Sequence, residues 1–179
     1  MKTVENKALM GIYRKDLTLS AAHQLREHGE FFYENVCDAL TGEIGYRSDG
    51  RYDLGDFLKG AKETYKKYLK LAKNAANSWG KKEEITQYTE MESQINEIIQ
   101  RTQMEHWGIN ENVHFSRWGD FTKEDFIPIV EAFHDLEGMF RCSKCQGTIN
   151  ITLVGEIPSN VKCPCGNIFW NLEPKKDNF

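Results

Sequence analysis

Two closely spaced pairs of cysteines near the end of the chain constrain its fold more than any other feature. The first pair is Cys142 and Cys145, with two residues between them, and the second is Cys163 and Cys165, with one. The seventeen residues between the pairs are enough for a β-hairpin that brings the four thiols together. Four thiols in one place form a tetrahedral metal site. The spacing therefore predicts a small unit that depends on a metal ion to fold.

The residues around the two pairs favour short strands, and therefore zinc. Apolar and polar residues alternate from Ile149 to Leu153, and a turn is expected at Gly155 or at Pro158. The run Ile168–Trp170 suits a third strand. We expect a zinc ribbon with one structural Zn²⁺, because four thiolates leave no open position for a substrate. Most zinc ribbons have Cys-x-x-Cys twice, so the second knuckle must be tighter here. Unliganded thiols, a disulfide and an iron–sulfur centre are the alternatives.

Composition and charge are those of an ordinary globular protein. The 179 residues are 40% hydrophobic and 28% charged, with a net charge of −4. No apolar run reaches the roughly eighteen residues of a membrane span, and the first residues lack the apolar segment of a signal peptide. We therefore expect a cytoplasmic protein without membrane contact, where paired cysteines bind metal more often than they form disulfides. The fifth cysteine, Cys37, is expected in a helical core.

Residues before the cysteine pairs have apolar positions at helical spacing. Helices are expected from Thr18 or Ser20 to Leu40, from Leu54 to Ser78, from Lys82 to Trp107 and from Thr122 to Phe140. Gly80 separates the second helix from the third, and two long helices joined by so short a turn should form an antiparallel hairpin. The predicted fold class is mainly α. A helical domain at residues 1–140 with a long antiparallel hairpin precedes a small β zinc ribbon at 141–179.

A stripe of lysines on the second predicted helix is a candidate for nucleic-acid or partner binding. At about 100° per residue its members fall within an arc of roughly 80°. They are Lys59, Lys62, Lys66, Lys70 and Lys73. The segment 59–82 holds eight lysines and one acid, whereas 83–137 holds thirteen acids and three basic residues. This asymmetry is suited to a phosphate backbone or an acidic partner. The alternative is a solvated helix face whose charge is balanced by neighbouring helices.

The segment from Arg101 to His106 is a second candidate. Arginine and histidine separated by four residues match the minimal signature of HEPN ribonucleases, helical proteins common in bacterial conflict systems. This resemblance implies a metal-independent endoribonuclease in which the pair acts on the ribose 2′-hydroxyl and the scissile phosphate. Positions five apart on a continuous helix point about 140° away from each other. A joint site therefore requires the helix to end nearby, as Trp107-Gly108 allows, and a histidine in the core is the alternative.

The run from Trp107 to Cys145 resembles the C-terminal part of helical proteins from bacterial anti-phage, abortive-infection-type defence operons. The shared pattern is Trp-Gly-Ile-Asn, Val-His-Phe-Ser, Phe-Thr-Lys-Glu-Asp-Phe, Glu-Ala-Phe and Phe-Arg-Cys-Ser-Lys-Cys. In those proteins a helical domain leads into a zinc ribbon, and an ATPase or nuclease is often encoded alongside. The resemblance implies an accessory subunit that binds such a protein partner, with DNA or RNA as a further ligand.

The sequence also lacks the common catalytic motifs. It has no phosphate-binding loop, no dinucleotide glycine pattern, no nucleophile elbow and no His-Glu-x-x-His. A non-enzymatic interaction subunit is therefore the leading hypothesis. A HEPN-like ribonuclease that uses Arg101 and His106 is the alternative.

Overall fold

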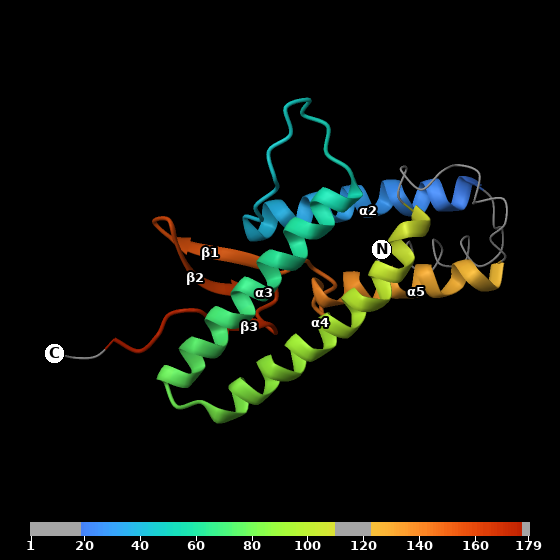
Figure 1. Cartoon of the computed structure of the whole chain (residues 1–179). Helices are drawn as coiled ribbons and strands as arrows, with labels where there is room; N and C mark the ends of the chain where they lie inside the picture. Colours follow the sequence, from blue (N-terminus) through green and yellow to red (C-terminus); the bar gives the residue numbers. More distant parts are fainter. Residues whose placement is uncertain (1–18, 110–122, 177–179) are drawn as a thin grey trace.

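The computed structural model describes residues 19–109 and 123–176, and their side chains over 24–101 and 127–176. The elements are α2 (Leu19–Leu40), α3 (Leu54–Ser78), α4 (Lys82–Ile109), α5 (Lys123–Met139), β1 (Asn150–Val154), β2 (Ile157–Lys162) and β3 (Phe169–Asn171). Figure 1 shows the sheet at one end of the helical body, beside α3. The predicted fold class is confirmed: the structure is mainly helical, with a small C-terminal antiparallel sheet and a cysteine cluster.

The long hairpin consists of α3 and α4, as predicted. α3 begins at a capping box, in which the Asp53 carboxylate accepts hydrogen bonds from the N–H groups of Gly55 and Asp56 at 2.8 and 3.2 Å. The Asp56 carboxylate accepts in return from the N–H of Asp53 at 3.0 Å. A turn at Trp79-Gly80 joins the two helices. α4 then continues to Ile109, two residues beyond its predicted end.

The outer helices pack on this hairpin, α2 against α3 and α5 against α4. Aromatic rings join them: Phe140, just after α5, makes edge contacts with Tyr33 of α2 and Tyr65 of α3 at centroid distances of 6.0 and 5.2 Å. Cys37 lies in this core as predicted, and its thiol donates to the carbonyl oxygen of Phe57 at 3.3 Å. Over the described part of the chain, no helix combines the length and apolar character that crossing a membrane requires.

The three strands form an antiparallel sheet in the order β1-β2-β3. The β1–β2 turn falls at Gly155, which has a φ of 65°, and Pro158 lies inside β2. Pro158 is tolerated there because it pairs with Leu153 where the register shifts, a position at which a missing N–H does least harm. The buried core continues from the helices into the sheet, from Leu25 to Leu172. A domain boundary at residue 140 stays a prediction.

Candidate metal centre

The first cysteine pair lies on a tight turn directly after α5. The N–H of Cys142 donates to the carbonyl oxygen of Gly147 at 3.0 Å, and the N–H of Gln146 donates back to the carbonyl of Cys142 at 2.8 Å. Gln146 has a φ of 58°, in the left-handed region that closes the turn. This knuckle therefore holds the sulfurs of Cys142 and Cys145 on one side of a backbone loop.

The second pair lies between β2 and β3 on a tighter turn, as the shorter spacing predicts. Cys163 follows β2, and its N–H donates a hydrogen bond to the carbonyl oxygen of Ile168 at 3.1 Å. The N–H of Ile168 also donates to the sulfur of Cys163 at 3.2 Å. Gly166 turns the chain with a φ of 73°, and its N–H donates to the carbonyl of Cys163 at 3.0 Å. The single residue between the cysteines, Pro164, faces the other knuckle.

The two knuckles touch each other through a glycine and a proline. A Cβ atom added to Gly147 would lie 2.8 Å from Cγ of Pro164, which is closer than atoms approach without displacement. Only glycine leaves room for the two turns to meet at this distance. This contact helps to bring the two cysteine pairs together.

The four sulfurs have the spacing of a tetrahedral metal site. They all lie within 4.8 Å of one another, and Cys142 and Cys163 are 3.7 and 3.5 Å from Cys165, sulfur to sulfur. Metal–sulfur bonds of about 2.3 Å place tetrahedral ligands about 3.8 Å apart. A disulfide needs sulfurs about 2.05 Å apart, so the alternative of a disulfide does not describe this arrangement. The donor set and its geometry fit one metal ion.

Proton affinities within the cluster show why four thiols at this distance suit a cation. Burial alone would raise the pKa of Cys163, but the Ile168 N–H and the neighbouring thiols lower it to about 6. The Asn167 N–H lowers the pKa of Cys165, yet the surrounding sulfurs, which compete for the same protons, raise it to about 12. Such sulfurs do not all ionise by themselves, whereas a divalent cation among them stabilises all four thiolates.

The position of the cluster limits its chemistry. Cys142 and Cys163 are buried, while Cys145 and Cys165 are exposed, so the centre lies at the surface beside the end of α5. A metal held by all four thiolates has no open position for water or a substrate. The arrangement is suited to stabilising the sheet rather than to catalysis.

Arg101 and His106 lie on one uninterrupted helix, because α4 continues to Ile109. Their positions therefore diverge by about 140°, and the helix ends at Ile109, three residues beyond His106. The guanidinium of Arg101 donates to the Asp135 carboxylate of α5 at 2.9 Å, which ties α4 to α5. The side chain of His106 lies outside the described residues. Catalysis by this pair stays a prediction, without a geometric observation in its favour.

The lysine stripe lies on α3 where the helical spacing places it. Lys59 and Lys70 are exposed, and Lys62, Lys66 and Lys73 are half-buried. The ammonium of Lys73 lies 2.8 Å from the Glu92 carboxylate of α4. The charge of this lysine is therefore balanced by the neighbouring helix. In the described ranges, the other four have no such ion pair.

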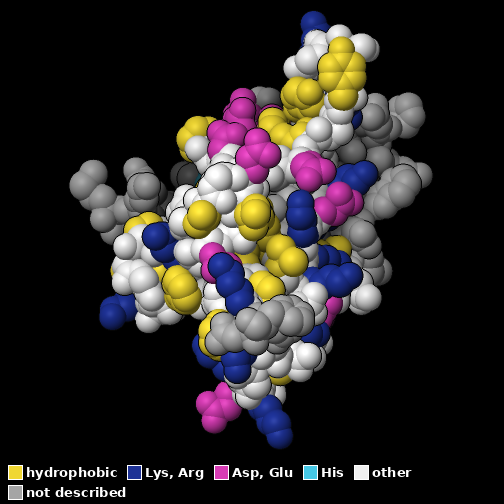
Figure 2. All heavy atoms as spheres, turned by 90° about the vertical axis from the view of Figure 1, so that its left-hand side faces the viewer, with side chains coloured by type: hydrophobic (Ala, Val, Ile, Leu, Met, Phe, Trp, Pro, Cys, Tyr) yellow, Lys and Arg dark blue, Asp and Glu magenta, His cyan; other side chains and the backbone are white. Residues whose placement is uncertain are grey.

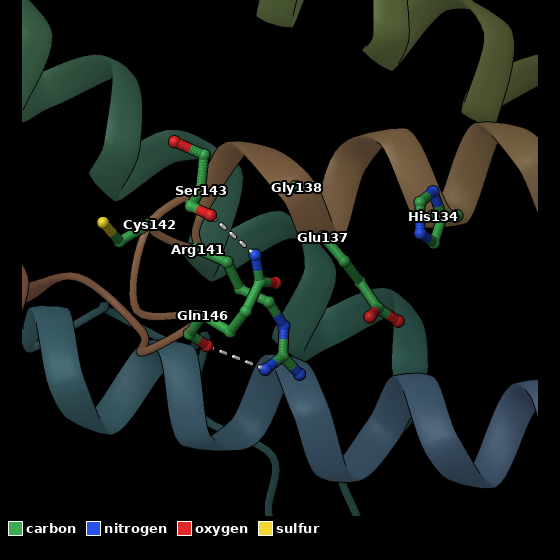
Figure 3. A pocket seen from close by; sticks show the side chains of 7 residues that line it. All are labelled: His134, Glu137, Gly138, Arg141, Cys142, Ser143 and Gln146. Atoms are coloured by element: carbon green, nitrogen blue, oxygen red, sulfur yellow. Dashed lines mark hydrogen bonds between the residues drawn. The ribbon is translucent and has the colours of Figure 1, made fainter. Parts of the chain in front are cut away.

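A pocket of about 240 Å³ lies beside the first knuckle, and sequence reasoning did not predict it. Figure 3 shows its lining at the end of α5: His134, Glu137, Gly138, Arg141, Cys142, Ser143 and Gln146. The Arg141 guanidinium donates to the carbonyl of Gln146 at 3.3 Å and lies 4.6 Å from the centre of the Phe32 ring. Glu137 is paired with His28 of α2, 2.8 Å away. No local signal could reveal a pair separated by 109 positions.

The pair of His28 and Glu137 makes stability depend on pH. The hydrogen bond to Glu137 raises the pKa of His28 above 6.5, against the opposing effect of burial. The folded state therefore binds a proton more tightly than the unfolded state, so this stabilisation is complete below pH 6.5 and is lost as pH rises through the folded pKa. We expect the stability of the wild type to fall across that window relative to His28→Gln. Urea denaturation at a series of pH values measures it, and parallel curves for the two proteins would contradict the assignment.

The chain matches no protein-family model, no curated protein and no solved structure. The resemblance to zinc-ribbon-tailed defence proteins rests on the run from Trp107 to Cys145, part of which, residues 110–122, lies outside the described residues. It stays a prediction.

Proposed function

We propose that this chain is a non-enzymatic interaction subunit of a bacterial defence complex, in which a Zn²⁺-stapled sheet presents a binding hairpin to a protein partner. The partner class that the resemblance implies is an ATPase or nuclease. The observation that carries the proposal is a group of exposed apolar side chains at the tip of the β1–β2 hairpin, on a sheet that is itself firmly packed on the helices.

Zinc is the ion that the centre suits best. Four thiolates on two knuckles of a small antiparallel sheet are the ligands of structural Zn²⁺ sites. The alternative is iron held by four cysteines. Metal analysis of the purified protein distinguishes the two ions directly. The visible spectrum does so too, because a zinc protein is colourless and an iron–thiolate protein absorbs visible light. We expect one Zn²⁺ per chain.

The hairpin tip has three apolar side chains in water. Leu153, Val154 and Ile157 are 41, 64 and 70% exposed, and they flank the turn at Gly155. Figure 2 looks onto this end of the molecule, where hydrophobic side chains gather on the surface. Branched apolar residues grouped at one exposed point favour a contact with another protein over solvation. Because the turn is fixed by strand pairing, the tip is preorganised for binding.

The rest of the described surface supports binding rather than chemistry. The metal ligands form a closed set, Arg101 is engaged with Asp135, and Glu137 in the pocket is engaged with His28. An enzyme needs a reactive group that meets its substrate in a suitable position. The pocket contains His134, which lies 4.0 Å from Asp135, but among the described residues no hydrogen bond joins this histidine to the hydroxyl of Ser143.

Charge at the hairpin tip is expected to abolish binding of the partner. The double variant Val154→Asp/Ile157→Asp should weaken binding to the proposed ATPase or nuclease partner by at least about 30-fold, because losing one hot-spot contact costs about 2 kcal/mol or more. The thermal midpoint should be unchanged, since both side chains are exposed. Co-purification and binding titration of the two purified proteins measure the effect.

The matched control is Phe31→Asp, which removes an apolar side chain that is 69% exposed on α2. It should bind as the wild type does. Loss of binding in the control but not in the hairpin variant would place the interface elsewhere. Metal-independent cleavage of RNA by the wild type, abolished in His106→Ala, would overturn the non-enzymatic proposal and favour the ribonuclease.

A further inference from the structure

The α3 helix carries a row of lysines that the hairpin interface does not use. Four of them have no acid as partner within the described residues: Lys59, Lys62, Lys66 and Lys70. At 1.5 Å per residue they extend over about 16 Å of the helix axis. Each strand of duplex DNA carries a phosphate about every 3.4 Å, so the row matches about five phosphates.

The centre of the row holds two cations that form no ion pair within the described residues. Lys62 and Lys66 are one helical turn apart and both are half-buried. Burial and the charge of Lys66 lower the pKa of Lys62, whereas Glu63 acts in the opposite direction. Partial burial of like charges is unfavourable unless an anion joins them. The protein therefore bears a cost here that a bound anion would relieve.

Over residues 93–101, the neighbouring helix α4 does not supply that anion. Lys73 pairs with Glu92, which places the row along the α4 side of α3. Between residues 93 and 101 of α4 the only acid is Glu97. Glu97 follows the fully buried Ile95 by two positions, so it points about 160° away from the packed face. Within residues 93–101 of α4, no acidic side chain is therefore directed toward Lys62 and Lys66.

From this arrangement we propose that Lys59, Lys62, Lys66 and Lys70 form a track for the phosphate backbone of a nucleic acid. Lysine binds phosphate as a point charge, so a row of lysines can follow a phosphate backbone without the bidentate contacts that arginine makes. The row contains no arginine, and its regular spacing suits a continuous polyanion. Such contacts position the nucleic acid without reading its sequence. The inference does not depend on the hairpin tip, which belongs to a different element.

Salt dependence of binding tests the track directly. The probes are a fluorescein-labelled RNA of about ten nucleotides, the DNA of the same sequence, and that DNA paired with its complement. For four phosphate contacts, raising salt from about 50 to about 200 mM should lower the affinity about 150-fold for the duplex and about 50-fold for the single strands. In Lys62→Gln/Lys66→Gln these factors should shrink to about 12-fold and about 7-fold, because two contacts remain. Fluorescence anisotropy gives the affinities.

The matched control is Lys67→Gln/Lys81→Gln, which removes the same charge from lysines that pair with Glu43 and Glu84. It should keep the salt dependence of the wild type. Equal losses in the two double variants would overturn the track, since binding would then follow net charge alone. Stronger binding of a polyglutamate peptide than of any oligonucleotide, lost in Lys62→Gln/Lys66→Gln, would overturn it in favour of an acidic protein. The three oligonucleotides show which nucleic acid the track prefers.

Discussion

Replacing Cys163 by serine is expected to release the metal and destabilise the protein by more than about 4 kcal/mol, because loss of a metal ligand is one of the few changes with so large an effect. Structural Zn²⁺ sites of this type contribute about 10 to 16 kcal/mol of apparent binding energy, as much as the whole stability of most domains. Cys163 is the ligand most closely integrated with the backbone, through its hydrogen bonds to Ile168. Metal content and urea denaturation of the variant measure the two effects.

The control for this experiment is Cys37→Ser. Cys37 is buried in the helical core, where burial raises the pKa of its thiol to about 11, and it lies far from the metal in the sequence. Its serine variant should keep one metal ion per chain and lose only a modest part of the stability. A Cys163→Ser protein that retains both its metal and its stability would show that three sulfurs suffice, and the centre would then have an open position.

Helices and strands with strong local signals could be predicted from the sequence. The bounds of α3 agree with the prediction because Asp53 caps its start and the Trp79-Gly80 turn follows its end. The candidate metal centre could also be predicted from the sequence, because each close pair of cysteines supplies two ligands on one tight turn. The end of α4 was predicted less closely. Trp107-Gly108 indicates the end of a helix, yet α4 continues to Ile109. A single glycine raises the free energy of a helix by only about 1 kcal/mol, which packing can offset.

Interactions between distant segments could not be predicted. The ion pair of Arg101 with Asp135 and the hydrogen bond of His28 to Glu137 depend on which helix faces meet. Periodicity shows that a helix has an apolar face, but not what lies against it. The same holds for the lysine row. The sequence did not indicate that Lys73 is paired with Glu92 while the other lysines of the row are not.

The second large effect is expected where the sheet meets the helical hairpin. Trp170 of β3 is 3% exposed, and its ring makes edge contacts with Tyr65 of α3 and Tyr88 of α4 at centroid distances of 5.3 and 6.2 Å. Trp170→Ala should cost about 3 to 5 kcal/mol, because it leaves a cavity among buried aromatic rings. The preceding residue provides the control: Phe169 is 57% exposed, and Phe169→Ala should change the stability by less than about 1 kcal/mol.

This substitution also separates anchoring of the sheet from metal binding. Trp170 contributes no ligand, so the alanine variant should retain one metal ion per chain while its unfolding midpoint in urea falls. If the sheet is an integral part of the helical core, as the continuous cluster from Leu25 to Leu172 indicates, wild-type unfolding should follow one transition by circular dichroism and by tryptophan fluorescence. Two separate transitions in the wild type, together with an unaffected helical transition in Trp170→Ala, would instead support independent domains on either side of residue 140.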